Sequence, residues 1–202
     1  MIIVVDYGVG NISSLLNMYE YLGIEAQSSS DTESIISASH LILPGIGAFD
    51  KAMATLIDAE LAQPVKMAAQ RGTQIMGVCL GMQLLAKHSE EGKLPGLGLI
   101  DADVTRISNG SNSELKVPHM GWANIGKSNS TALFPDAATE ERFYFAHSYY
   151  MRPASNDVIA ATVNYGNSLC VAVSQANVHG VQFHPEKSHK FGMRLMKAFA
   201  EL

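Results

Sequence analysis

The first half of the chain alternates short hydrophobic runs with longer amphipathic segments. Ile2 to Val5 is a continuous hydrophobic run of the kind found in strands buried on both faces of a parallel sheet. Further strands are predicted near Glu25 to Ser28, at Leu41 to Leu43 and at Gln74 to Val78. The turn residues that follow these runs mark where each strand ends.

Helices are predicted between most of these strands. A helix from about Ser13 to Tyr21 ends at Gly23, because glycine readily adopts the left-handed conformation that closes a helix. A helical region from about Asp50 to Gln70 is broken or restarted at Pro64, and Gly81 to Ala86 begins another helix. This order of strand, helix, strand, strand, helix, strand and helix predicts an open, mostly parallel sheet with helices on both faces.

After about Leu94 the pattern changes to short β-like segments separated by Gly, Asn and Pro turns, and a final helix is expected from about Lys190 to Glu201. We therefore expect an α/β fold in which the second half adds a mixed or antiparallel extension to the sheet. No repeat or low-complexity tract divides the chain, so residues 1–202 are expected to form a single domain. The expected β-segments of this half are 143–149, 158–164, 170–174 and 180–183.

The overall composition fits one well-buried core, with 47% hydrophobic and only 16% charged residues in 202 positions. The formal net charge is −5, and no run of Lys or Arg is present. This mildly acidic balance argues against a nucleic acid or an anionic membrane as a partner.

The number of cysteines and the first residues of the chain indicate in which cellular compartment the protein is expected. Cys79 and Cys170 are the only cysteines, which is too few for a disulfide framework and indicates a reducing compartment. The hydrophobic run at the start lacks a basic flank and is too short for a signal peptide or a membrane span. We expect a soluble, cytoplasmic protein.

Cys79 lies in a Gly-x-Cys-x-Gly motif, between a predicted strand and a predicted helix. Gly77 and Gly81 permit the tight turn of a nucleophile elbow, which lifts the side chain above the sheet. A helix N-terminus next to the sulfur favours the reactive thiolate. A buried structural cysteine on a Gly-rich turn is the alternative, but the flanking strand and helix favour a nucleophile.

Two further segments supply what a thiolate nucleophile requires. His184 could transfer protons and Glu186 could orient its ring, although a solvent-exposed His and Glu on a turn would look the same. The segment Gly45 to Ala48 follows a predicted strand and could present backbone N–H groups to a developing oxyanion, although a plain strand-to-helix loop is the simpler interpretation.

In this order, these three segments resemble the class I (triad-type) glutamine amidotransferases over essentially the whole chain. The resemblance implies their flavodoxin-like fold. Within that family the chain is most similar to the glutaminase subunits of imidazole glycerol phosphate synthase. Four further segments support this narrower match, namely residues 6–11, 118–122, 147–150 and 184–188.

The resemblance implies a site that needs no metal and no cofactor, with L-glutamine as substrate. Glu91 would pair with the substrate ammonium, although from the residues alone an exposed acid in a turn is a second interpretation. The backbone around Ser148 and Tyr149 would hold the substrate carboxylate. The implied roles are a catalytic triad of Cys79, His184 and Glu186, oxyanion donors at Gly45, Gly47 and Leu80, and substrate contacts from Gln83, Glu91, Ser148 and Tyr149.

The resemblance also implies a heterodimer with a (β/α)8-barrel synthase that receives the ammonia, with Asn11, Trp122 and Lys187 as interface candidates. From the residues alone, Trp122 is equally well read as a core residue or as an interface anchor, and the resemblance favours the interface. One departure is the segment Ala123-Asn124, where the family would place Asn directly after the Trp.

The function implied is glutamine hydrolysis that feeds ammonia to a synthase making imidazole glycerol phosphate and AICAR in histidine biosynthesis. The segment Ser188 to Met193 departs from histidine-pathway members and favours a sister group that supplies ammonia to a sugar-amidinating synthase of surface-polysaccharide biosynthesis. Two further alternatives are a non-catalytic regulatory subunit, which the intact triad argues against, and a free-standing cysteine peptidase or hydrolase.

Overall fold

A large mixed sheet organises the molecule. The computed structural model describes residues 1–108, 115–128, 131, 133–135 and 140–202, and within these ranges the largest of three sheets has eight strands. The first five in spatial order run parallel, in the flavodoxin-like arrangement, and the last three continue it antiparallel, which confirms the expected fold. Their order is β2 (Ala26–Ser29), β1 (Ile2–Val5), β3 (His40–Leu43), β4 (Gln74–Val78), β13 (Val178–Val181), β12 (Asn167–Gln175), β11 (Ile159–Tyr165) and β8 (Gly126–Lys127).

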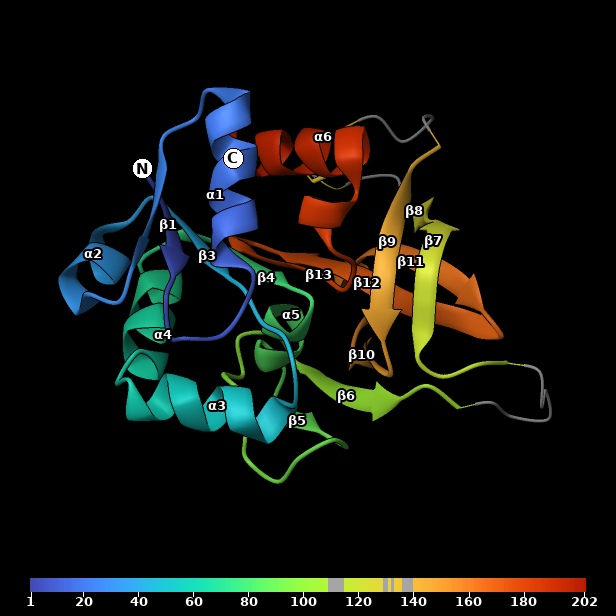
Figure 1. The fold of residues 1–202 in the computed structure, drawn as a ribbon. Helices are drawn as coiled ribbons and strands as arrows, with labels where there is room; N and C mark the ends of the chain where they lie inside the picture. Colours follow the sequence, from blue (N-terminus) through green and yellow to red (C-terminus); the bar gives the residue numbers. More distant parts are fainter. Residues whose placement is uncertain (109–114, 129–130, 132, 136–139) are drawn as a thin grey trace.

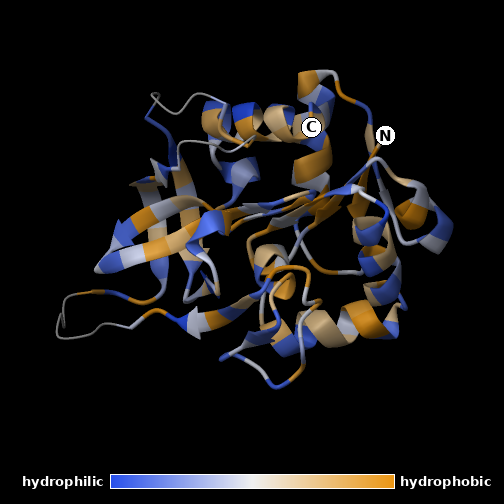
Figure 2. Cartoon of the chain, turned by 180° about the vertical axis from the view of Figure 1, so that it is seen from behind, coloured by the Kyte–Doolittle hydropathy of each residue, from blue (hydrophilic) through white to orange (hydrophobic). Residues whose placement is uncertain are grey.

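Helices cover both faces of this sheet (Figure 1). Because neighbouring residues of a strand point to opposite faces, the run Ile2 to Val5 contributes to two cores. Ile3 and Val5 pack with α3 and α4, and Ile2 and Val4 pack with α1 and α6. Figure 2 shows the resulting concentration of hydrophobic residues in the central strands. The helices are α1 (Ile12–Leu22) and α6 (His189–Ala200) on one face, and α3 (Phe49–Asp58), α4 (Ala62–Gln70) and α5 (Leu80–Leu84) on the other.

One helix, α2 (Thr32–Ser37), was not predicted from the sequence, and it connects β2 to β3. Only Ile35 of this helix is buried, so the segment shows no hydrophobic periodicity. The Asp31 side chain caps it by accepting a hydrogen bond from the Ser34 N–H at 2.8 Å. Since β2 and β3 both run parallel to β1, a crossover of this kind is required between them.

The predicted break at Pro64 is wrong by a few residues. The chain leaves α3 after Asp58 and turns at Glu60, whose φ is 59°. Pro64 lies instead within the first turn of α4, where the missing N–H of proline leaves no hydrogen bond unmade.

The segment expected as one strand over 143–149 is two strands that belong to different sheets. They separate at Ser148. β9 (Arg142–His147) pairs with β7 (His119–Asn124), whereas β10 (Tyr149–Pro153) pairs with β6 (Ala102–Arg106), which also pairs with β5 (His88–Ser89).

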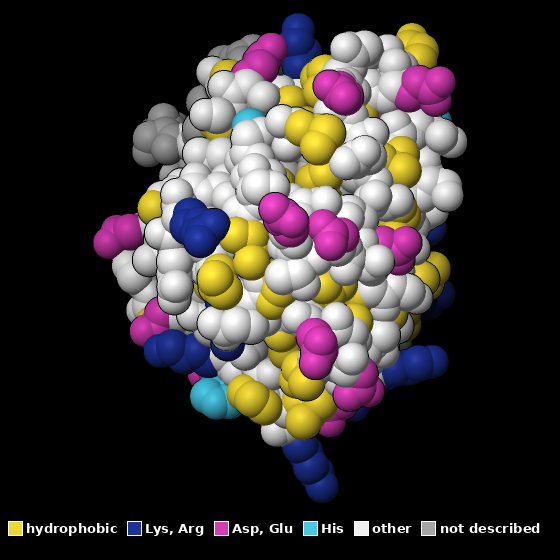
Figure 3. Space-filling view, turned by 90° about the vertical axis from the view of Figure 1, so that its left-hand side faces the viewer, with side chains coloured by type: hydrophobic (Ala, Val, Ile, Leu, Met, Phe, Trp, Pro, Cys, Tyr) yellow, Lys and Arg dark blue, Asp and Glu magenta, His cyan; other side chains and the backbone are white. Residues whose placement is uncertain are grey.

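The surface over α2 and α4 mixes acidic and hydrophobic side chains, and its Lys and Arg side chains are scattered (Figure 3). Among the described residues, no helix is long and apolar enough to cross a membrane.

Gly45 and Gly81 bring the loop after β3 into backbone contact with the first turn of α5, and Gly77 lets the end of β4 approach the same turn. A Cβ atom on Gly45 would lie 2.6 Å from the Gly81 nitrogen. A Cβ on Gly77 would lie 2.7 Å from the Met82 Cα, and a Cβ on Gly81 would overlap the Leu43 carbonyl oxygen. Because backbone atoms oppose each position, no flexible side chain can move aside.

We predict that Gly81→Ala lowers the free energy of unfolding by at least about 2 kcal/mol, because the added methyl group overlaps the Leu43 carbonyl. Chemical denaturation of the full chain measures this. Gly126→Ala is the matched control: its Cβ would lie 3.4 Å from the Thr162 hydroxyl, an ordinary contact, and its effect should stay within about 0.5 kcal/mol. Equal stability of the two variants would contradict the proposed backbone contact.

Candidate active site

A pocket of about 410 Å³ lies at the carboxyl edge of the parallel strands, the usual place for a ligand site in such a sheet. Cys79 follows β4, the loop 44–48 follows β3, and His184 follows β13. Residues distant in sequence therefore meet at one edge. The pocket is lined by Ile46, Gly47, Cys79, Leu80, Gln83, Glu91, Pro118, Met120, Ala146, His147, Ser148, Tyr149, His184 and Lys187.

Cys79 adopts the strained backbone conformation expected of a nucleophile elbow. Its φ is 55° and its ψ is −112°, a region that residues with a side chain rarely occupy. The turn is held by the Cys79 N–H, which donates to the Val181 carbonyl at 2.8 Å. Leu80 is the first residue of α5, so its N–H has no acceptor within the helix and is available at the pocket.

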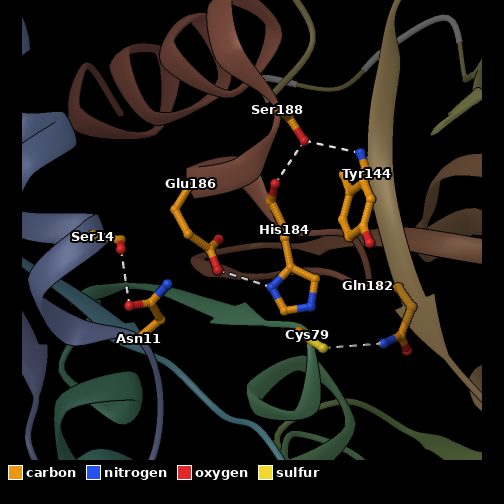
Figure 4. A network of polar contacts seen from close by, with 8 residues as sticks. All are labelled: Asn11, Ser14, Cys79, Tyr144, Gln182, His184, Glu186 and Ser188. Atoms are coloured by element: carbon orange, nitrogen blue, oxygen red, sulfur yellow. Dashed lines mark hydrogen bonds and ion pairs between the residues drawn. The ribbon is translucent and has the colours of Figure 1, made fainter. Parts of the chain in front are cut away.

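His184 and Glu186 form a buried pair beside this sulfur. The His184 Nδ1 lies 2.8 Å from the Glu186 Oε1, and the other ring nitrogen faces Cys79 (Figure 4). The Glu186 side chain is only 3% exposed. Ser188 fixes the backbone here, because its hydroxyl donates to the His184 carbonyl at 2.6 Å and accepts from the Tyr144 N–H at 3.0 Å.

The pKa of His184 is raised to about 10. Burial by itself lowers this pKa, but hydrogen bonds and charges from Cys79 and Glu186 outweigh it. At neutral pH the ring is therefore a cation next to the sulfur, and it carries a proton that it can donate.

Two buried amides connect the sulfur to the wall of the pocket. The Gln182 Nε2 lies 3.9 Å from the Cys79 Sγ, and the Gln182 Oε1 accepts from the Gln83 Nε2 at 3.0 Å. Gln83 also donates to the Tyr149 carbonyl at 3.3 Å, while its own Oε1 is buried and has no hydrogen-bond partner among the described residues. A substrate in the pocket can supply the missing donor to this oxygen.

The loop after β3 is fixed at its start and open at its tip. The Tyr7 hydroxyl donates to the Pro44 carbonyl at 2.6 Å, which anchors the peptide ahead of Gly45. Gly45 is buried against α5, whereas Gly47 is exposed, has a φ of 89° and lines the pocket with Leu80. Of the predicted oxyanion positions, Gly47 and Leu80 thus meet Cys79 at the pocket, and Gly45 lies beneath it.

Glu91 lines the pocket and is half-buried rather than exposed. Its Oε2 accepts a hydrogen bond from the Phe49 N–H at 2.9 Å, at the start of α3. This contact holds a carboxylate where a substrate ammonium could pair with it.

Trp122 lies outside the pocket and is not a core residue, since it is 41% exposed. Its ring stacks parallel to that of His189 at a centroid distance of 5.6 Å, and the Arg142 guanidinium lies 5.4 Å from its centroid. Lys187 is exposed at the pocket, and Asn11 accepts a hydrogen bond from the Ser14 hydroxyl at 2.9 Å (Figure 4).

Several residues of this site were not predicted from the sequence. Tyr7 and His147 belong to segments that carried the family resemblance, and this was a signal that could have found them. Gln182 and Ser188 flank the predicted His184 and Glu186, but their contacts depend on tertiary structure. In the described part of the chain, no group of three or more His, Cys, Asp or Glu is arranged to hold a metal ion.

Comparisons with known proteins bear on the family and the fold of the chain. Residues 3–201 match the family model described as glutamine amidotransferase class-I. The chain is 48% identical to imidazole glycerol phosphate synthase subunit HisH 2 of Pseudomonas aeruginosa, with both chains fully covered. It is 44% identical to the subunit of the same name in Methanococcus maripaludis, over 98% of each chain. A crystal structure of a glutamine amidotransferase has the same fold, with a TM-score of 0.76 at 23% identity over 98% of this chain and 97% of the other.

We predict that Glu186→Gln lowers the pKa of His184, because it removes one of the negative charges that raise it. An ¹⁵N NMR titration of the His184 ring in both proteins measures the change. Glu25→Gln removes the same charge from an exposed position on the far edge of the sheet and should leave the titration unchanged. A His184 pKa that is equal in wild type and Glu186→Gln would show that Glu186 does not stabilise the charged ring.

Proposed function

Because this chain belongs to the class-I glutamine amidotransferase family, we propose that it hydrolyses glutamine at Cys79 and supplies the ammonia to a synthase partner in histidine biosynthesis. The family match spans residues 3–201, so we infer a single amidotransferase domain over residues 1–202. The observation that carries the proposal is the meeting of a strained cysteine, a buried His–Glu pair and two backbone N–H positions at one pocket.

In the first half of the reaction, the Cys79 thiolate attacks the side-chain amide carbon of glutamine. The backbone N–H groups at Gly47 and Leu80 face the oxygen that becomes negative, and such donors contribute about 3–4 kcal/mol each in comparable sites. His184 donates its proton to the nitrogen as the carbon–nitrogen bond breaks. Ammonia leaves, and a γ-glutamyl thioester remains on Cys79.

In the second half, the same imidazole acts as a base. Once Cys79 is acylated, its negative charge and its hydrogen bond to His184 are lost, and both had raised the His184 pKa. The pKa therefore falls, and the neutral ring takes a proton from the attacking water. Hydrolysis releases glutamate and restores the thiolate, and Glu186 keeps the ring oriented throughout.

The walls of the pocket match the charges of a glutamine molecule. Glu91 pairs with its ammonium, and the backbone at Ser148 and Tyr149 holds its carboxylate. Gln83 presents its unpaired Oε1 to the substrate as an acceptor. These contacts place the side-chain amide at Cys79.

The partner docks on the rim of the pocket. Three large apolar side chains are exposed there or next to it: Ile46 is 52% exposed, Met120 63% and Trp122 41%. Exposed apolar side chains gathered around a reaction centre are typical of an interaction surface. With Asn11 and Lys187 they form the docking surface for a (β/α)8-barrel cyclase subunit in a heterodimer. Support for a partner comes from the relatives, which are named as subunits of imidazole glycerol phosphate synthase.

A second candidate is a paralogous subunit that supplies the same ammonia to a sugar-amidinating synthase. Two points support it. The segment Ser188 to Met193 departs from the pattern that the resemblance leads us to expect of histidine-pathway members. Methanococcus maripaludis has two subunits named HisH, and the chain is 44% identical to the one numbered 2 and 40% identical to the one numbered 1. The glutaminase chemistry is the same in both candidate functions, and the synthase that binds this chain decides between them.

We predict that Cys79→Ala abolishes the glutamine-dependent activity of the complex and leaves its ammonium-dependent activity within about twofold of wild type. The reason is that only ammonia production uses the thiolate. Product formation by this chain with the imidazole glycerol phosphate synthase barrel subunit of the same organism, supplied with glutamine or with ammonium, measures both. Cys170→Ala, at a buried cysteine away from the pocket, is the control that should retain both activities. Glutamine-dependent activity in Cys79→Ala would contradict the proposal.

We predict that Trp122→Ala weakens binding of the same barrel subunit by roughly 10- to 100-fold, as expected for a large ring at the centre of an interface. Calorimetric titration of one subunit with the other measures the dissociation constant. Tyr21→Ala removes a ring that is 81% exposed at the far end of α1, and binding should be unchanged. If the two variants bind alike, Trp122 lies outside the interface.

A further inference from the structure

His147 and His119 form a buried pair that the hydrolysis steps above do not use. His147 lines the pocket at the end of β9, and His119 begins the neighbouring strand β7. The two side chains are nearly inaccessible, at 5% and 4% exposure. His119 is packed between the rings of Phe145 and Tyr165, with centroid distances of 4.7 and 4.0 Å, so the His119 ring is not free to turn.

One backbone carbonyl determines where the protons of both rings lie. The His147 Nδ1 is 2.8 Å from the Tyr149 carbonyl oxygen, and a carbonyl can only accept, so this nitrogen carries the proton. In a neutral ring the Nε2 then has a lone pair. The His119 Nδ1 lies 3.0 Å from that Nε2 and must be its donor. The pKa of His147 is lowered to about 4, chiefly by burial and also by the neighbouring His119 and His184, which keeps the ring neutral at physiological pH.

The same carbonyl also determines how the side-chain amides of Gln83 and Gln182 are oriented between the pocket and the Cys79 sulfur. Gln83 must direct its Nε2 at the Tyr149 oxygen, so its Oε1 is the atom left for the substrate. The second hydrogen of that Nε2 reaches the Gln182 Oε1, which in turn directs the Gln182 Nε2 at the Cys79 sulfur. The orientation of each group thus follows from a single acceptor at the start of β10.

We propose that His147 is a positioning residue for glutamine binding, held in its Nδ1–H tautomer by His119 and acting through the Tyr149 carbonyl on Gln83 and on the Ser148–Tyr149 backbone. This rests on the proposed function, in which that backbone receives the substrate carboxylate. Loss of the His147 donor frees the Tyr149 peptide to rotate. The pocket then loses its fit to the carboxylate, while the reactivity of Cys79 is retained.

Two substitutions separate this role from simple packing. In His147→Asn the side-chain amide nitrogen reaches the position of the former Nδ1 and can still donate to Tyr149. In His147→Gln the amide reaches the position of the former Nε2, so the contact with His119 can be kept but the donor to Tyr149 is lost. Both variants retain a neutral polar side chain of similar size.

The test is the rate of covalent labelling of Cys79 in the full chain by two reagents. The glutamine analogue 6-diazo-5-oxo-L-norleucine needs the carboxylate site, and iodoacetamide does not. We expect His147→Gln to slow labelling by the analogue at least tenfold, His147→Asn to stay within threefold of wild type, and both to react with iodoacetamide at the wild-type rate. Equal analogue rates in the two variants, or parallel changes with both reagents, would overturn the proposal.

A second measurement uses the wild-type chain and so does not depend on the stability of any variant. Long-range ¹H–¹⁵N correlation spectra identify which ring nitrogen of His147 is protonated, and we expect Nδ1–H at neutral pH. A proton on Nε2 would overturn the proposal. If wild-type Cys79 reacts with iodoacetamide but not with the glutamine analogue, the proposed function fails instead, and the two failures are therefore distinguishable.

Discussion

The backbone contact between Gly45 and Gly81 is the constraint on which the site depends. It brings the loop after β3 against the first turn of α5, so that Gly47 and Leu80 line the same pocket as Cys79. A side chain at either position would separate the two segments, because backbone atoms lie where its Cβ would be. The strained backbone of Cys79 is held by this contact and by the hydrogen bond from the Cys79 N–H to the Val181 carbonyl.

The charges at the site control the protonation of the His184 ring. His184 lies between the sulfur and the buried Glu186, and burial alone would keep its ring neutral. Cys79 and Glu186 together raise the His184 pKa enough to keep the ring charged, and acylation of Cys79 removes its share of that effect. One imidazole can therefore serve as the acid and then as the base of a single reaction cycle, without any change in its position.

Much of the fold could be predicted because Ile2 to Val5, Leu41 to Leu43 and Gln74 to Val78 show the continuous hydrophobic pattern of buried parallel strands. The helix α2 could not, since Ile35 is its only buried residue and its cap looks like a polar loop. The separation of β9 from β10 at Ser148 also left no trace in a run of continuous β-like residues.

In the site, too, residues in local sequence motifs could be predicted, whereas contacts between residues far apart in sequence could not. Cys79, His184 and Glu186 stand out because their motifs are local in sequence. The contacts of His147 with His119 and of Tyr7 with Pro44 join residues 28 and 37 positions apart, and no sequence pattern records them. What the sequence lacked was the spatial partner of each residue, not the residue itself.

Trp122 is the only tryptophan of the chain, and it is already fixed between His189 and Arg142 before any partner arrives. A ring held in this way loses little conformational entropy on association, so more of the contact energy remains as affinity. Because Trp122 is the single tryptophan, it also serves as an intrinsic fluorescence probe. Its fluorescence arises from one half-exposed indole beside the pocket, and burial of that indole would report complex formation without any label.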